Sequence, residues 1–255
     1  MSTILVAADI GFGNAKAVTI TGTTIIPSIV AIPAGDLGMA GIGMKTARRA
    51  RRITFDRGDF FVGPSAPSWG RVVENLDFSR LASPEAEALL YAVMSDLVPS
   101  GATVRLVLGL PVPLLRDEAV ARPVMESLRA RLTREHRFQV NGQDFSFTVM
   151  GLRAAAQPVG AWADWALNED GHWAVPTAKG ALVAVADIGF NTLDLYGVRG
   201  GRIEPRLVGG DKVGVRRLLD LAAPGAPYHE AEALVRDGRI PDEARATWLS
   251  EVLGT

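Results

Sequence analysis

The sequence contains no cysteine. This excludes disulfides, thiolate zinc sites, iron–sulfur clusters and cysteine nucleophiles, and it is typical of proteins in a reducing compartment. An excess of charge of one sign is also lacking, because 27 basic residues face 28 acidic ones. No overall field therefore favours a nucleic acid or an anionic membrane, and we expect a cytoplasmic protein.

Long hydrophobic runs are missing as well. No run approaches the roughly 18 apolar residues of a membrane-spanning helix, and the first residues lack the pattern of a secretory signal. Three histidines, His136, His172 and His229, lack metal-ligand spacing, so each is interpreted as a surface or loop residue. With 48% apolar and 22% charged residues, the sequence predicts an ordinary globular protein with no membrane contact.

A repeated tetrad is the most informative feature that is present. Residues 9–16 read DIGFGNAK and residues 187–194 read DIGFNTLD, and each copy follows a short apolar run. Two further strand-like segments follow each tetrad. The order strand, Asp-Gly turn, strand, turn, strand therefore occurs twice, which indicates two related α/β halves.

Turn residues and hydrophobic spacing predict the other elements. Residues 33–75 form an insertion with a hairpin around 56–58, and Ser83-Pro84 supplies the N-cap and first-turn proline of a helix. The remaining expected elements are a buried strand over 104–112, a hairpin around Asn141-Gly142, and helices over about 115–132, 154–167, 211–223, 228–237 and 241–253.

Either tetrad alone is more simply explained as a tight turn at a strand end, where glycine permits positive φ and aspartate bonds nearby amides. The pair favours a second interpretation. Two such turns can offer two carboxylates, Asp9 and Asp187, and two sets of amides to a magnesium polyphosphate. Gly11 and Gly13 would let the backbone approach phosphate oxygens, and Lys16 would add a positive charge. Neither GxxxxGK[ST] nor GxGxxG occurs, which disfavours a P-loop or a Rossmann turn.

These motifs resemble the actin-like ATPases, in particular the bacterial ParM or StbA branch that segregates plasmids. DIGFGNAK is similar to the first phosphate loop of that family and DIGFNTLDLYGV to the second, with the Thr-x-Asp step typical of the branch. GLPVPLLRDE, FFVGPSA and AAAQPVGAW are similar to other family segments, and the match runs in order from residue 4 to about residue 222.

The resemblance implies an actin-like, ribonuclease H-like α/β fold with duplicated lobes, each with a mixed five-stranded sheet flanked by helices. Lobe I would span residues 1–165, with subdomain IB inserted at about 33–75, and an incomplete lobe II would span 180–255. The family normally continues to another Gly-Gly turn and a final helix. Since this sequence ends at EVLGT, we expect lobe II to be the less stable lobe and to lack most of the base pocket.

The resemblance also implies site residues. Asp9 and Asp187 would hold the water shell of Mg²⁺. Contacts to ATP or GTP would come from the first turn, the second turn and a loop near the ribose: Gly11, Phe12, Gly13, Asn14 and Lys16, then Gly189, Phe190, Asn191 and Thr192, then Gly209, Gly210, Asp211 and Lys212.

Two of these positions keep a simpler alternative. Gln157 would position the attacking water, or it is only the residue before Pro158 at a helix start. Asp211 would lie near the ribose, or it is a plain helix N-cap, and the two interpretations are compatible.

The implied function is nucleotide-dependent filament formation with ATP hydrolysis in an inter-lobe cleft, used for plasmid or DNA segregation with a DNA-bound adaptor. The basic run of the insertion is interpreted as a solvated or subunit-contact face rather than a DNA site: Lys45, Arg48, Arg49, Arg51 and Arg52. The main alternative is a non-catalytic actin-like module that binds a partner or a filament end. A small-molecule kinase would need a substrate-side base, and the sequence offers no candidate for one.

Overall fold

The computed structural model describes residues 3–34, 50–75, 77–116 and 118–254. The chain divides into two compact units, which are described separately below. Unit 1 comprises Met1–Gly109 and Arg122–Ala154, and unit 2 comprises Leu110–Ala121 and Ala155–Thr255.

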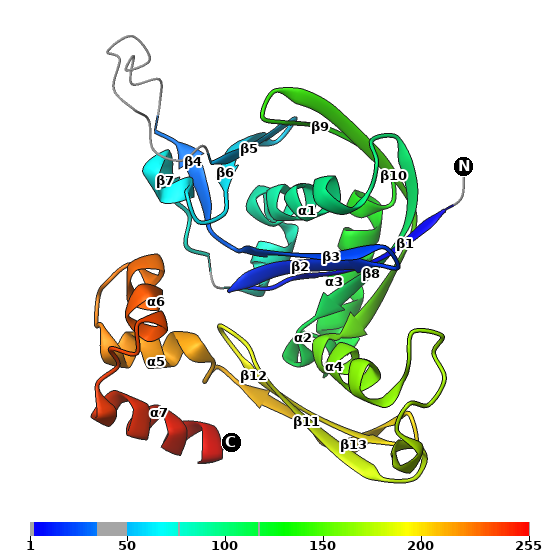
Figure 1. Cartoon of the computed structure of the whole chain (residues 1–255), viewed down its shortest axis with the longest axis vertical. Helices are drawn as coiled ribbons and strands as arrows, with labels where there is room; N and C mark the ends of the chain where they lie inside the picture. The colour runs from blue at the N-terminus through cyan, green and yellow to red at the C-terminus, as the bar shows by residue number, and fades with distance from the viewer. Residues whose placement is uncertain (1–2, 35–49, 76, 117, 255) are drawn as a thin grey trace. The chain divides into compact units, whose positions relative to one another are not determined.

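Unit 1 is built on one extended mixed sheet (Figure 1). Its strands are β1 (Ile4–Ile10), β2 (Asn14–Thr19), β3 (Gly22–Pro27), β4 (Val30–Pro33), β5 (Arg51–Phe55), β6 (Gly58–Val62), β7 (Gly70–Val72), β8 (Ala102–Leu110), β9 (Glu135–Val140) and β10 (Gln143–Ala156). Its helical elements are η2 (Ala66–Ser68), η3 (Phe78–Ala82), α1 (Pro84–Leu97) and most of α3 (Glu118–Leu132).

The strand order is β3-β2-β1-β8-β10-β9-β5-β6-β4-β7. β1 pairs antiparallel with β2 and parallel with β8, so the first five strands in this order form the expected five-stranded mixed sheet. β5 pairs with β9, and this pairing extends the sheet into the strands of the 33–75 insertion. The predicted α/β class is therefore confirmed, with a larger sheet than expected.

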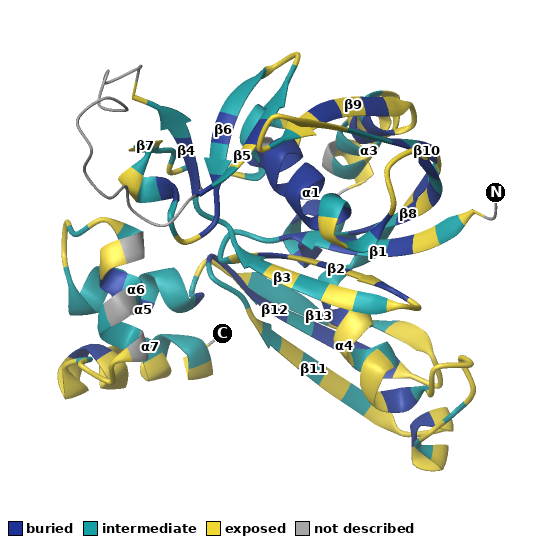
Figure 2. Cartoon of the chain, turned by 45° about the horizontal axis from the view of Figure 1, so that its top comes forward, coloured by how far each residue is buried: buried dark blue, intermediate teal, exposed yellow. Residues whose placement is uncertain are grey.

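Helix α1 forms the centre of the core of unit 1. Ser83 accepts a hydrogen bond from the Ala86 N–H at 3.2 Å, as the predicted N-cap requires, and Pro84 occupies the first turn. α1 packs across β2 and β3, and its residues 86–94 are all buried (Figure 2). Burial of such an apolar surface is the dominant stabilising contribution in a domain of this kind.

The second predicted hairpin of unit 1 is confirmed, and one histidine prediction is wrong. Asn141 and Gly142 have φ of 53° and 82°, as a two-residue hairpin turn requires. His136 lies on β9 and is fully buried, although the sequence suggested a surface or loop position. Its ring bonds Tyr91 at 3.0 Å and the Leu132 carbonyl at 2.8 Å, and these partners explain why a polar ring is tolerated in the core.

Unit 2 is built on a smaller antiparallel sheet. It contains β11 (Leu182–Ile188), β12 (Leu193–Arg199) and β13 (Arg202–Asp211), with α2 (Val112–Arg116), α4 (Gln157–Ala166), η4 (Pro176–Lys179), α5 (Val215–Ala222), α6 (Tyr228–Arg236) and α7 (Asp242–Gly254). Helices α2 and α4 pack on this sheet, where Val112, Tyr196 and Val198 form a buried cluster. Along β11, exposed positions alternate with half-buried ones (Figure 2).

Two of the expected helices differ in extent from the prediction. The single helix expected over about 115–132 is two helices, and α2 begins earlier, at Val112. The helix expected from residue 211 begins at Val215, because β13 continues through Asp211. None of the described helices is long and apolar enough to cross a membrane.

Candidate functional site

The first tetrad forms the turn between β1 and β2. Asp9 pairs with Lys16 on β2 and with Gly109 on β8, so the carboxylate and the ammonium group belong to neighbouring positions of one sheet. Cross-strand partners project from the same face of a sheet. A Cβ on Gly11 would lie 2.8 Å from the Asn14 carbonyl oxygen, and therefore the close approach of the chain here requires glycine.

Hydrogen-bond donors reach the carbonyl groups of the first turn from one side. The Ser28 hydroxyl donates to the Gly11 carbonyl at 2.7 Å, and the Ser28 N–H donates to the Gly13 carbonyl at 2.9 Å. Arg80 also donates to the Gly11 carbonyl, at 3.1 Å. Because a trans peptide unit is planar, the Phe12 N–H points opposite to the Gly11 C=O, away from these donors. Such oriented amides favour an anion.

The second tetrad forms the turn between β11 and β12, and its carbonyls are also held from one side. The Gly189 N–H closes the turn on the Thr192 carbonyl at 2.8 Å. The N–H groups of Val215 and Arg216, in the first turn of α5, donate to the Gly189 and Phe190 carbonyls at 3.0 and 2.7 Å. By the same planarity argument, the N–H groups of the following residues point away from α5.

Gly214 supports the second turn, and the sequence analysis did not single it out. A Cβ at this position would lie 2.6 Å from the carbonyl oxygens of both Gly189 and Phe190. These atoms belong to the backbone and cannot rotate away. Gly214 is the N-cap residue of α5, so the alternative interpretation of Asp211 as the N-cap of this helix is wrong. Asp211 instead accepts the Lys212 N–H at 2.7 Å.

Two carboxylates face each other across β11 and β12 in unit 2, where Asp187 pairs with Asp194. Asp194 is 2% exposed and accepts one long hydrogen bond, 3.4 Å, from the Val112 N–H. Among the described residues, its Oδ1 has no hydrogen-bond partner. Burial raises the pKa of Asp194 to about 6, and the charge of Asp187 acts in the same direction.

The sequence marks Asp194 through the Thr-x-Asp step of the second turn, but Asp194 is not among the residues predicted to bind the nucleotide or the metal ion. Asp194 ends the segment DIGFNTLD, at the position that Lys16 occupies in DIGFGNAK. Opposite Asp194 lies Gly210, where a Cβ would come within 3.0 Å of the Asp194 carboxylate. The structure therefore brings Asp187, Asp194 and Gly210 together on one end of the sheet.

The chemistry of this carboxylate pair fits Mg²⁺ held through water. Hard oxygen ligands with an oxygen left unpartnered suit an ion that retains most of its hydration shell. Within the described ranges, no group of three or more His, Asp or Glu residues could hold a metal ion directly.

The other predicted residues lie at element boundaries. Gln157 is the first residue of α4, directly before Pro158. Gly209 and Gly210 belong to the end of β13, and Lys212 follows that strand. Asn14 begins β2, and Thr192 is buried directly before β12. Their roles toward a nucleotide stay predictions.

The described part of the basic run forms internal ion pairs. Arg51 pairs with Asp96 at 2.9 Å and also donates to the Ala92 carbonyl at 2.8 Å. Arg52 pairs with Asp59. Lys45, Arg48 and Arg49 lie outside the described residues.

More than half of the chain matches one known protein family. Residues 7–160 match the family model described as actin-like proteins N-terminal domain. The chain belongs to the actin-like proteins. A comparison with curated proteins gives no match.

Solved structures show the same fold for this actin-like protein. Apo psk41 ParM has a TM-score of 0.70 at 12% identity, covering 100% of this chain and 80% of that chain. Ta0583, an archaeal actin homolog, has a TM-score of 0.70 at 19% identity, covering 91% and 71%. A filament structure of AlfA from B. subtilis plasmid pLS32 has a TM-score of 0.58 at 18% identity, covering 86% and 76%. Ta0583 has also been solved with ADP, and an AlfA filament with AMPPNP.

Proposed function

We propose that this actin-like protein binds one magnesium nucleotide, ATP or GTP, with its two tetrad turns and assembles into filaments in a nucleotide-dependent manner. Filaments of this kind would serve plasmid or DNA segregation through a DNA-bound adaptor. The observation that carries the proposal is a feature common to the two turns. In each turn, hydrogen-bond donors reach the backbone carbonyls from one side, so the backbone N–H groups that follow them point to the opposite side. Structures of relatives with ADP and AMPPNP support nucleotide binding, and the AlfA filament supports self-association.

In this proposal the two turns have different roles. Lys16 and the amides of the first turn bind the β- and γ-phosphates, which are rich in acceptor oxygens. Asp187 and Asp194 hold the water shell of Mg²⁺, and Asp9 contributes from the first turn. When bound, the ion neutralises phosphate charge and orients the chain of phosphates. The buried position of Asp194 gives its carboxylate a strong electrostatic preference for a cation.

Hydrolysis needs a group that orients water, and Gln157 is our candidate. Its side-chain carbonyl can accept a proton of the attacking water, and its place at the first position of α4 fixes the backbone from which the side chain extends. Gln157→Ala should slow phosphate release and leave nucleotide affinity within about twofold, because the amide acts only on water in the reaction step. Equal hydrolysis by the variant would remove Gln157 from the mechanism.

Calorimetry with Mg-AMPPNP and light scattering with Mg-ATP test the proposal together. The parent chain should bind the analogue and scatter more light when Mg-ATP is added. Asp187→Ala should lose both properties, whereas the control Asp242→Ala changes a fully exposed side chain and should match the parent. Absence of binding and of a scattering change in the parent would contradict the proposal. Binding without hydrolysis or assembly would instead favour a non-catalytic module.

A further inference from the structure

We propose that Arg80 is a positioning residue of the first turn, whose buried guanidinium fixes the Gly11 carbonyl and places an unpaired positive charge behind the amides that bind a polyphosphate. This inference rests on the proposed function, since it assigns a role toward the ligand of that turn. Arg80 lies on η3, 69 residues from Gly11 in the sequence, and no sequence motif marks it.

Arg80 packs directly against the turn. Arg80 is only 7% exposed, and its Nη1 donates to the Gly11 carbonyl at 3.1 Å. The guanidinium carbon lies 5.3 Å from the centre of the Phe12 ring, and this ring lies 6.4 Å from that of Phe78. The hydrogen bond and the cation–π contact therefore fix two consecutive residues of the turn, Gly11 and Phe12.

No carboxylate among the described residues balances the charge of Arg80. Among the described residues it makes no ion pair, and burial lowers its pKa to about 10, so the group stays charged at neutral pH. The charge of Glu85 opposes this shift, but no ion pair joins Glu85 and Arg80. A buried charge without a counter-ion is costly, and a bound polyphosphate would supply the missing negative charge.

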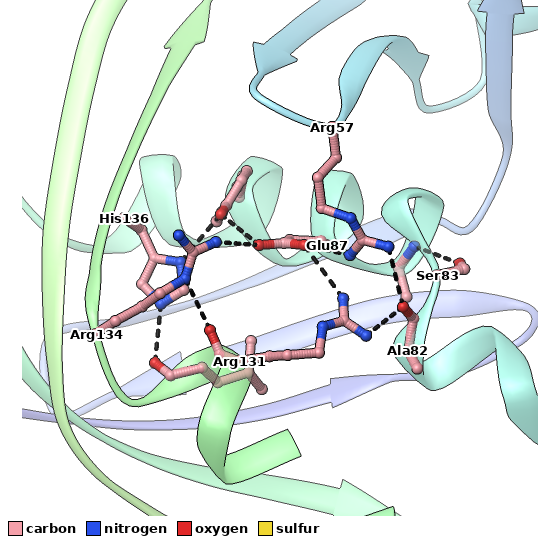
Figure 3. A network of polar contacts seen from close by, with 10 residues as sticks. Arg57, Ala82, Ser83, Glu87, Arg131, Arg134 and His136 are labelled. Carbon is pink, nitrogen blue, oxygen red and sulfur yellow. Dashed lines mark hydrogen bonds and ion pairs between the residues drawn. The ribbon is translucent and has the colours of Figure 1, made fainter. Parts of the chain in front are cut away.

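Contacts outside the turn hold η3 in place (Figure 3). The Ala82 carbonyl, at the end of η3, accepts hydrogen bonds from Arg57 at 3.3 Å and from Arg131. Both arginines also pair with Glu87 of α1, at 2.7 and 3.3 Å. Arg80 is thus attached to an anchored segment, so its position relative to the turn is fixed before a ligand binds.

Calorimetry with Mg-AMPPNP on Arg80 variants tests the inference. Arg80→Gln can still donate a hydrogen bond but carries no charge, and we expect affinity to fall about 10- to 100-fold. Arg80→Lys keeps the charge without the planar fork, and we expect a loss of about three- to tenfold. Arg51→Gln is the matched control, because Arg51 also bonds a backbone carbonyl but does not contact the turn; it should stay within about twofold of the parent.

A second readout separates positioning from a purely structural role. Mg-tripolyphosphate should raise the melting temperature of the parent, and this increase should shrink in Arg80→Gln even after the apo melting temperature is taken into account. An unchanged increase and unchanged AMPPNP affinity in Arg80→Gln would overturn the inference. If circular dichroism shows that Arg80→Gln is unfolded, Arg80→Lys becomes the test. An affinity of Arg80→Lys equal to that of the parent would then overturn the inference. A parent chain that binds neither probe would contradict the proposed function itself.

Discussion

Two buried carboxylates, one in each unit, have opposite electrostatic surroundings. Glu87 in unit 1 is 4% exposed and Asp194 in unit 2 is 2% exposed. Burial alone would raise the pKa of Glu87, but hydrogen bonds from Tyr91 and Arg57 and the charges of the arginines lower it below its usual value. Asp194 has a single weak donor among the described residues and a neighbouring carboxylate, and its pKa is raised to about 6. The first carboxylate is compensated within the fold and the second is not.

This difference separates a structural group from a candidate ligand-binding group. Three arginines and a tyrosine hydroxyl complete the Glu87 site, which leaves no need for an external partner. Asp194 retains an oxygen without a hydrogen bond among the described residues, and in the proposed function this carboxylate faces the water shell of Mg²⁺. The two turns also differ in charge. Lys16 places a positive charge at the position of the repeat where Asp194 places a negative one.

The largest expected effect is on Glu87. Glu87→Gln should lower the free energy of unfolding by about 3 kcal/mol, because removal of one member of a buried ionic network leaves the others uncompensated. The three arginine side chains retain partial solvent access, which keeps the expected loss near the lower end of the known range. Urea unfolding measures this change. Glu135→Gln, at an exposed pair with Arg137, is the control and should cost less than about 1 kcal/mol.

Asp194→Asn should have the opposite sign in the absence of ligand. The neutral amide removes a desolvated charge and its repulsion from Asp187, while its oxygen can still accept the Val112 N–H. We expect the unfolding free energy at pH 7.5 to rise by about 1 to 2 kcal/mol. Mg-AMPPNP affinity should fall in the same variant. A variant that is less stable than the parent yet binds the analogue equally well would remove the contrast with Glu87.

The two carboxylates should also differ in their pH dependence, with a smaller effect. Since the pKa of Asp194 is raised in the folded state, its stabilising contribution is complete below about 3.8 and is lost as pH rises through about 6. Lowering the pH from 7.5 to 5.5 should therefore stabilise unit 2 by about 1 kcal/mol. The contribution of Glu87 is present above its usual pKa of 4.5 and is lost only at lower pH, so it should not change in this range.

Hydrogen exchange in the presence of EDTA measures this difference by peptide. Peptides from β11 to β13 should gain protection at pH 5.5 after correction for the intrinsic exchange rate, and peptides from α1 should not. The gain should vanish in Asp194→Asn. Equal gains in both units, or a gain that persists in the variant, would show that Asp194 does not cause it.

Local signals in the sequence predicted much of the fold. Ser83-Pro84 and Asn141-Gly142 fix backbone geometry through neighbouring residues alone, and the helix cap and the hairpin turn were found where these pairs occur. The repeated tetrads predicted both turns for the same reason. The start of α5 was misplaced because Asp211 is a good N-cap residue in isolation, whereas strand pairing with β12 keeps it in β13.

Contacts between distant segments could not be predicted in this way. Ser28 and Arg80 reach the first turn from 17 and 69 residues away, and nothing in their neighbours indicates it. His136 looked like a surface residue because its buried partner, Tyr91, lies 45 residues away. Gly214 is required by the space around it rather than by a turn type, so only the packed structure shows its role.

The proposed function requires both turns to contribute to one nucleotide site, and the stoichiometry of Mg-AMPPNP binding tests this requirement most directly. Calorimetry on the parent should give one molecule per chain. Lys16→Met in the first turn and Asp187→Asn in the second should each weaken that single event, by more than about tenfold, because each removes a charge from the same ligand. Two molecules bound per chain, or one turn's variant that leaves affinity unchanged, would contradict the account.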